Sequence, residues 1–100
     1  MNKKELLHKE ALTDDLILVQ FYAEWCPHCQ RMKSVVNEFE KAKKVALVIK
    51  INIDDEEDLA NEYDIDTIPT FVFMRQGEQL WHPSGELTLE KLEGAVNNYK

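Results

Sequence analysis

The sequence predicts an α/β fold, in which a mixed four-stranded sheet carries helices on both faces. Two apolar runs, Leu16–Ala23 and Val45–Ile53, are typical of strands that are buried on both sides. Between them, apolar residues recur at helical spacing. Near the C-terminus, two short apolar segments flank the tight turn Arg75–Glu78, as in a β-hairpin. A length of 100 residues fits one domain, residues 1–100, with a single packed core.

The N-terminal half is expected to alternate between helix and strand. Residues 3–12 favour a helix, and the strand Leu16–Ala23 follows it. From Cys26 the apolar spacing becomes that of a second helix. The buried stripe of this helix contains Met32, Val35, Val36 and Phe39. The strand Val45–Ile53 comes next and should pair in parallel with the first strand, because the connection between them is a helix.

In the C-terminal half, the segment Asp54–Glu57 is expected to open a short third helix, because acidic side chains are favoured at the positive end of a helix dipole. The strand Thr70–Met74 follows and returns through Gln79–Trp81 as a hairpin, which adds an antiparallel edge to the sheet. Thr88 is expected to cap a last helix. The apolar face of that helix contains Leu89, Leu92, Val96 and Tyr99.

Charge and hydropathy exclude some classes of partner. A net charge of -7 argues against a nucleic acid, because phosphate binding needs a basic face. No segment approaches the roughly 20 apolar residues that cross a membrane. Residues 1–4 carry the charges of a signal peptide, but polar residues interrupt the apolar core that should follow. A cytoplasmic location is therefore expected, although the sequence leaves open an export signal that has been removed.

The two cysteines of the chain lie in the segment Trp25-Cys26-Pro27-His28-Cys29, between the first predicted strand and the second predicted helix. Two thiols at this spacing can close a disulfide and reopen it by exchange. Cys26 is placed at the helix N-terminus, where free backbone N–H groups and the helix dipole favour the thiolate. We therefore expect Cys26 to attack a substrate disulfide and Cys29, on the buried stripe, to resolve the mixed disulfide.

The residues around the thiols are candidates for tuning this chemistry. Pro27 fits the first turn of a helix and stiffens the loop. A protonated His28 would stabilise the thiolate and the reduced form, which makes a cysteine pair a stronger oxidant. Trp25 is expected to form part of a platform for the substrate.

Two other interpretations compete with thiol–disulfide exchange. A redox-sensing module would use the same fold to bind a protein partner without efficient turnover. A metal or iron–sulfur site shared between two chains is a weaker alternative. A structural zinc site within one chain needs four ligands, and the remaining candidates are His8, His28 and His82. The sequence therefore favours exchange, without a metal or an organic cofactor, because the cysteine pair itself carries the electrons.

Several motifs in order resemble the thioredoxin family over nearly the whole chain. They are the strand leading into the cysteines (residues 21–26), Lys50-Ile51-Asn52-Ile53-Asp54, Tyr63-Asp64-Ile65, Thr67-Ile68-Pro69-Thr70, Gly77 and Gly85. The resemblance implies a thioredoxin-like fold and a protein-disulfide oxidoreductase that acts on protein disulfides or dithiols as a monomer. It also implies a cis peptide bond between Ile68 and Pro69, which would shape the substrate groove with Trp25, and a flavoenzyme of the thioredoxin-reductase type as a partner.

The chain departs from the family at positions that should change its chemistry. Thioredoxins carry Gly-Pro between the cysteines, whereas Pro27-His28 resembles the loop of bacterial periplasmic disulfide donors. The pair is therefore expected to be more oxidising than that of ordinary thioredoxin. Gln20 replaces the family's buried aspartate, which leaves Lys50 without its expected partner. The short N-terminus leaves room for the loss of the family's first edge strand.

Overall fold

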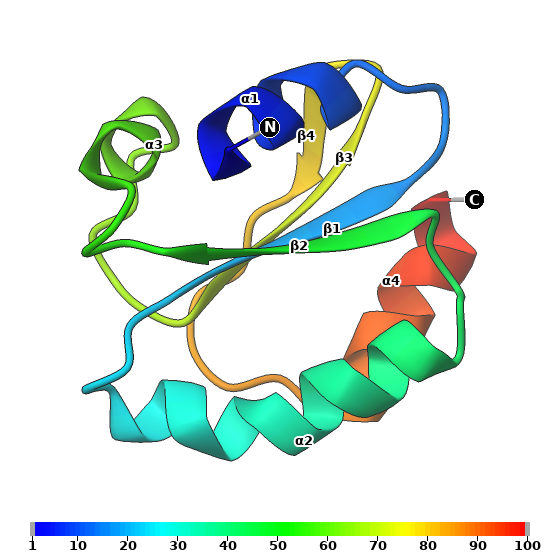
Figure 1. Cartoon of the computed structure of the whole chain (residues 1–100). Helices are drawn as coiled ribbons and strands as arrows, with labels where there is room; N and C mark the ends of the chain where they lie inside the picture. Colours follow the sequence, from blue (N-terminus) through cyan, green and yellow to red (C-terminus); the bar gives the residue numbers. More distant parts are fainter. Residues whose placement is uncertain (1, 100) are drawn as a thin grey trace.

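The computed structural model describes residues 2–99, which form one mixed sheet and helices on both of its faces (Figure 1). The elements are α1 (Lys3–Glu10), β1 (Ile17–Tyr22), α2 (Pro27–Lys41), β2 (Leu47–Asn52), α3 (Glu57–Glu62), β3 (Thr70–Arg75), β4 (Glu78–Trp81) and α4 (Leu89–Tyr99). The strand order is β2-β1-β3-β4. Strand β1 runs parallel to β2 and antiparallel to β3, and β3 pairs antiparallel with β4. The predicted sheet is therefore confirmed, and α1 occupies the part of the described chain that precedes β1.

The sheet separates two apolar layers. Helices α1 and α3 cover one face, and α2 and α4 cover the other (Figure 1). Successive side chains of a strand point to opposite faces, so Val19 packs in the layer of α1 and α3, and Leu18 packs in the layer of α2 and α4. Both residues are fully buried. This two-sided burial explains why β1 reads as an almost continuous apolar run.

The hairpin between β3 and β4 has the predicted position. Arg75 pairs with Glu78, so the connection consists of Gln76 and Gly77. Both have positive φ angles, 54° and 77°, as a two-residue turn that matches the twist of the strands requires. The turn also donates two hydrogen bonds to the chain after α1, from Gly77 N to the Ala11 carbonyl (2.6 Å) and from Gln76 N to the carbonyl of residue 13 (2.7 Å). These bonds fix an irregular segment there, and α1 ends at Glu10 instead of residue 12.

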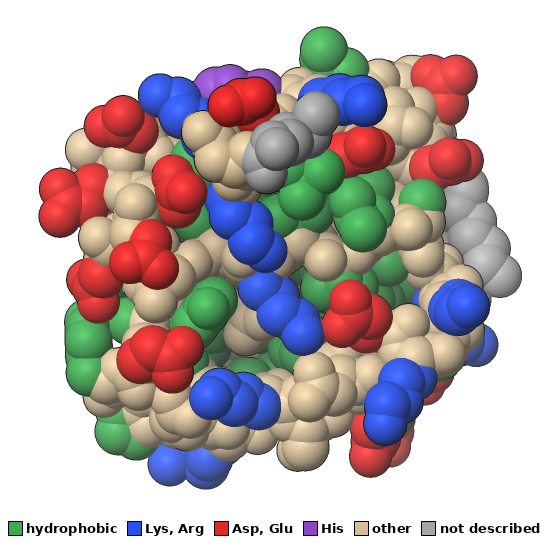
Figure 2. Space-filling model, in the orientation of Figure 1, with side chains coloured by type: hydrophobic (Ala, Val, Ile, Leu, Met, Phe, Trp, Pro, Cys, Tyr) green, Lys and Arg blue, Asp and Glu red, His purple; other side chains and the backbone are tan. Residues whose placement is uncertain are grey.

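The third helix begins later than predicted. It starts at Glu57, because Asn52 holds the intervening residues in a turn. The Asn52 carbonyl accepts from the backbone N–H of Asp55 (3.1 Å) and Glu56 (3.0 Å), and its side-chain oxygen accepts from Asp54 N (2.9 Å). The acidic residues therefore lie mostly before the helix. Figure 2 shows acidic side chains gathered on the side of the molecule that carries α3, and basic side chains interspersed with acidic ones elsewhere on this face.

Candidate active site

The two cysteines meet where β1 leads into α2. Cys26 is the N-cap of α2, and Pro27 is its first helical residue. The Cys26 Sγ accepts a hydrogen bond from the backbone N–H of Cys29 at 3.2 Å, which satisfies one of the free N–H groups of the first turn. Both cysteines are free thiols and nearly buried, with 3% of Cys26 and 2% of Cys29 exposed. Cys26 therefore lies at the start of α2, as predicted, but it is buried nearly as deeply as Cys29 and does not form an exposed rim.

The environment of Cys29 keeps its thiol protonated. Burial, followed by the neighbouring sulfur of Cys26, raises the pKa of Cys29 to about 11. At neutral pH this side chain is therefore a thiol, and it must lose a proton before it can act as a nucleophile. A group that accepts this proton would control how fast Cys29 reacts.

A loop far along the sequence completes the site on the other side of Cys26. The peptide bond between Ile68 and Pro69 is cis, the geometry that the resemblance implied. The Ile68 carbonyl faces the Cys26 Sγ at 3.9 Å. The Pro69 carbonyl accepts from Gly85 N at 2.7 Å, which ties this loop to the segment before α4. The structure thus brings together residues that lie about 40 positions apart in the sequence.

Trp25 forms the exposed rim of the site. Trp25 is a large apolar residue on the surface, with 67% of the residue exposed to solvent. Its indole Nε1 donates to Asp54 Oδ2 at 2.9 Å, so the ring is held in one orientation beside Cys26. The partner Asp54 was not predicted as a site residue, because the contact joins two loops that are distant in sequence.

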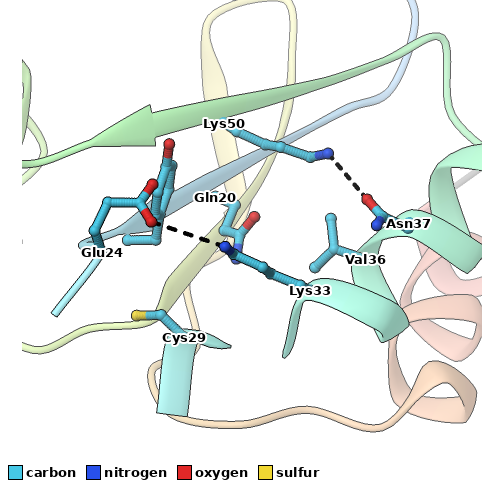
Figure 3. Close-up of a pocket in the computed structure, with 8 residues that line it drawn as sticks. Gln20, Glu24, Cys29, Lys33, Val36, Asn37 and Lys50 are labelled. Atoms are coloured by element: carbon cyan, nitrogen blue, oxygen red, sulfur yellow. Dashed lines mark hydrogen bonds and ion pairs between the residues drawn. The ribbon is translucent and has the colours of Figure 1, made fainter. Parts of the chain in front are cut away.

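A cavity of about 240 Å³ lies behind Cys29, between the sheet and α2 (Figure 3). Its lining consists of Gln20, Tyr22, Glu24, Cys29, Lys33, Val36, Asn37 and Lys50. Gln20 is 4% exposed and shares this cavity with Cys29. Glu24 pairs with Lys33 across its mouth at 3.8 Å. The cavity therefore connects the buried thiol with polar side chains.

Lys50 has a partner that the sequence analysis did not predict. It lies opposite Gln20 in the register of β1 and β2, as expected. Its Nζ, however, lies 3.2 Å from Asn37 Oδ1 (Figure 3). The same Nζ lies 3.1 Å from Glu40 Oε1, and both partners belong to α2. Lys50 therefore pairs with a carboxylate from α2 instead of one at position 20. Helix spacing places Asn37 and Glu40 on one face of α2, but their meeting with β2 depends on the tertiary packing.

His28 lies in a charged cluster on the outer side of α2. Its Nδ1 lies 2.7 Å from Glu86 Oε2 and 2.7 Å from Arg31 Nη2. Arg31 also donates to both carboxylate oxygens of Glu86, at 3.0 to 3.2 Å. His28 was predicted to lie beside the thiols, but neither of its two partners was predicted. Arg31 could have been found from its i, i+3 spacing on the helix, whereas Glu86 comes from a distant loop.

The charge of Glu86 predicts a measurable dependence of stability on pH. Hydrogen bonds from Arg31, and secondly from His28, lower the pKa of Glu86 to about 2. A carboxyl group whose pKa is lowered in the folded state stabilises the fold at pH values above its ordinary pKa of 4.5. This contribution is lost as the pH falls toward the folded-state pKa of about 2. We expect the free energy of unfolding, measured in urea, to be higher for wild type than for Glu86→Gln at pH 7. This difference should shrink as the pH falls from 4.5 to 2. A constant difference over this range would contradict the assignment.

Comparison with known proteins identifies the family. The thioredoxin family model matches residues 1–98. The chain belongs to the thioredoxin family. It is 43% identical to thioredoxin-1 of Drosophila melanogaster over 72 residues, which cover 71% of this chain and 67% of the relative. It is 36% identical to the thioredoxin of Porphyra purpurea over 96 residues, which cover 91% and 87% of the two chains.

Solved thioredoxin structures share the fold. A thioredoxin from Nicotiana alata superposes with a TM-score of 0.87 at 26% identity, over all of this chain and 88% of that one. A thioredoxin from Halobacterium salinarum gives 0.82 at 30% identity, over 99% and 86%. The chain therefore has the α/β thioredoxin fold and is a thiol–disulfide oxidoreductase, a protein-disulfide reductase with a redox-active Cys26–Cys29 pair, and its family acts on protein disulfides.

Two further observations concern other kinds of site in this thioredoxin-family chain. Over residues 2–99, no helix is long and apolar enough to cross a membrane. In the same part of the chain, no three His, Cys, Asp or Glu side chains are grouped so that they could hold a metal ion.

Proposed function

We propose that this chain reduces exposed disulfides of proteins as a cytoplasmic, monomeric, one-domain enzyme, with Cys26 as the attacking nucleophile and Cys29 as the resolving thiol. The observation that carries the proposal is the position of the Cys26 Sγ. It caps α2, accepts the N–H of Cys29 and faces the Ile68 carbonyl, so it lies at the boundary between the helix and the neighbouring loop. A sulfur in this place is stabilised as a thiolate by the helix N-terminus.

The reaction follows from the two positions. The Cys26 thiolate attacks one sulfur of the substrate disulfide, whose S–S bond breaks, and the other substrate sulfur leaves as a thiolate and takes up a proton. Cys29 then loses its proton and attacks the Cys26 Sγ of the mixed disulfide. The second substrate sulfur leaves, and a Cys26–Cys29 disulfide remains. Two electrons have passed to the substrate, and a flavoenzyme of the thioredoxin-reductase type would return them to the pair.

The groove for the substrate runs along Trp25, Ile68 and Pro69. Trp25 supplies exposed apolar surface on one side of Cys26, and Ile68 is half-buried on the other. An apolar side chain next to the substrate cysteine can bury area on the indole, which is a general form of recognition that does not require a particular sequence. This arrangement supports a broad range of protein substrates.

The proposed pair is more oxidising than that of an ordinary thioredoxin. Pro27 and His28 between the cysteines are the basis for this proposal, because a cation beside the thiolate stabilises the reduced form. The test is to equilibrate the protein with glutathione buffers and measure the fraction of oxidised pair. We expect a potential above the value of about -270 mV that is typical of thioredoxin, in the direction of -180 to -120 mV. A value at or below -270 mV would refute this part of the proposal.

Gln20 is proposed to slow the resolving step, because an amide cannot take the proton of Cys29. In Gln20→Asp, a carboxylate would share the cavity with that thiol. We expect resolution of the mixed disulfide at pH 7 to become at least about tenfold faster, since a well-placed general base typically contributes about 10²–10⁴-fold. Stopped-flow kinetics with a small disulfide would measure the rate. Gln20→Asn is the matched control, since it shortens the side chain equally without adding a base. Equal rates for the two variants would sink the idea.

A further inference from the structure

The contacts of Glu86 link the loop before α4 to the first turns of the active-site helix. Gly85 N bonds to the Pro69 carbonyl, and Glu86, the next residue, binds both Arg31 and His28 of α2. We call Arg31, Glu86 and His28 the charged clasp. It joins α2 to the loop before α4, and Gly85 of that loop is bonded to the Pro69 carbonyl. His28 lies between the two cysteines in sequence.

The clasp allows two arrangements of hydrogens around the imidazole. The Nδ1 of His28 lies 2.7 Å from both Glu86 Oε2 and Arg31 Nη2. One nitrogen cannot donate to a carboxylate and accept from a guanidinium at the same time. A protonated imidazole, or the tautomer with hydrogen on Nδ1, donates to Glu86, and the other neutral tautomer accepts from Arg31. In both arrangements Glu86 holds Arg31 in place.

The charges of the clasp act on Cys26. Cys26 is the N-cap of α2, and His28 and Arg31 lie two and five residues after it on the first turns of the same helix, so the charged groups of the clasp are close to the Cys26 sulfur. The side chain of Arg31 is half exposed. Glu86 carries the opposite charge 3.0 Å from Arg31 Nη2 and 2.7 Å from His28 Nδ1. It therefore offsets the positive charge that would otherwise favour the reduced pair.

We propose that Glu86 is a positioning residue that holds the imidazole of His28 by Nδ1, balances the charge of Arg31 and so limits the oxidising power of the Cys26–Cys29 pair. The inference rests on the proposed thiol–disulfide exchange. It explains how a loop with the sequence Cys-Pro-His-Cys can serve a reductase. A protonated imidazole at position 28 would make the pair more oxidising, and a carboxylate bonded to it would oppose the effect.

Glu86 is distinguished from other acidic groups near the site by its two cationic partners. Glu24 pairs with Lys33 on the cavity side, at the longer distance of 3.8 Å. Asp54 accepts from the indole of Trp25. Among these carboxylates of the described chain, Glu86 is the one bonded to His28, so its removal should have the largest effect on the thiol pair.

The experiment measures the equilibrium constant for reduction of the Cys26–Cys29 disulfide by glutathione, with the whole chain, for wild type and for Glu86→Gln. The substitution keeps the shape of the side chain and removes its charge. We expect the reduced protein to be favoured by about threefold, the order of effect of one water-screened unit charge. This corresponds to about 14 mV toward more oxidising values, because a tenfold change in the constant is 29.6 mV. Arg31→Gln should shift the constant in the opposite direction.

Two controls separate charge from structure. Glu90→Gln makes the same charge change on an exposed residue of α4 and should leave the constant unaltered. In 1 M salt, where charges are screened within about 3 Å, the effect of Glu86→Gln should largely disappear. A folded Glu86→Gln variant with an unchanged or lowered equilibrium constant at low salt would overturn the inference. Failure of the wild-type pair to exchange with glutathione would instead refute the proposed function.

Discussion

Cys26→Ser is expected to abolish reduction of protein disulfides, whereas Cys29→Ser is expected to stop the reaction at a mixed disulfide. The sulfur of Cys26 lies at the N-terminus of α2 and faces the Ile68 carbonyl, so we expect it to meet the substrate first. Cys29 lies in the first turn of α2, behind the capping sulfur of Cys26, so we expect it to react only with a substrate that Cys26 has already bound. Incubation with a disulfide-containing protein, followed by non-reducing electrophoresis, should show a covalent complex with Cys29→Ser and none with Cys26→Ser.

The matched control is Cys26→Ser/Cys29→Ser, which has neither thiol and should form no complex. Loss of at least a thousandfold in turnover is expected for both single variants, because no other side chain of the described site is a thiol. A complex formed through Cys29 in Cys26→Ser would reverse the assigned roles. Retained tight binding of a natural partner by the double variant would favour the redox-sensing module instead.

Phe73→Ala is expected to lower the free energy of unfolding by about 3–5 kcal/mol, the usual cost of truncating a buried aromatic side chain. Phe73 is fully buried on β3, where its ring meets Phe39 edge to face at 6.3 Å and stacks on Trp81 at 6.0 Å. This loss is a large fraction of the roughly 5–15 kcal/mol that stabilises a domain of this kind. Urea unfolding of the reduced protein, followed by circular dichroism, would measure it.

Phe73→Leu is the control for this substitution. It keeps an apolar side chain in the layer of α2 and α4, so it should cost clearly less than Phe73→Ala. A loss below 1 kcal/mol for Phe73→Ala would show that the layer can close around the missing ring. Such a result would contradict the tight packing of Phe39, Phe73 and Trp81.

The order of elements and the thiol pair could be predicted because their signals are local. The apolar run before Cys26 and the helical spacing after it are visible within residues 16–39 of the sequence. The start of α3 was misplaced because Asn52 captures three backbone N–H groups in a turn. Acidic residues favour a helix start in general, but they do not determine which of several adjacent residues begins it.

The charged contacts of the site depend on tertiary structure and were not predicted. Glu86 lies 55 positions after Arg31, and the two meet because the Pro69 carbonyl fixes the neighbouring Gly85. In the same way, Lys50 reaches Glu40 only because β2 lies beside α2. Pairs of this kind leave no periodic pattern in a single sequence. The sequence shows that Gln20 and His28 differ from the residues that thioredoxins usually carry there, but it does not show which side chains surround them.

The order β2-β1-β3-β4 leaves two edge strands, and both are poor templates for pairing with a foreign strand. Strand β4 has four residues, and its pairing with β3 shifts register between Phe73 and Met74. Strand β2 carries the inward-pointing charge of Lys50 at its centre. Short strands, bulges and inward charges discourage aggregation between sheets. An enzyme whose family acts on protein disulfides can therefore meet other chains without recruiting their strands into its own sheet.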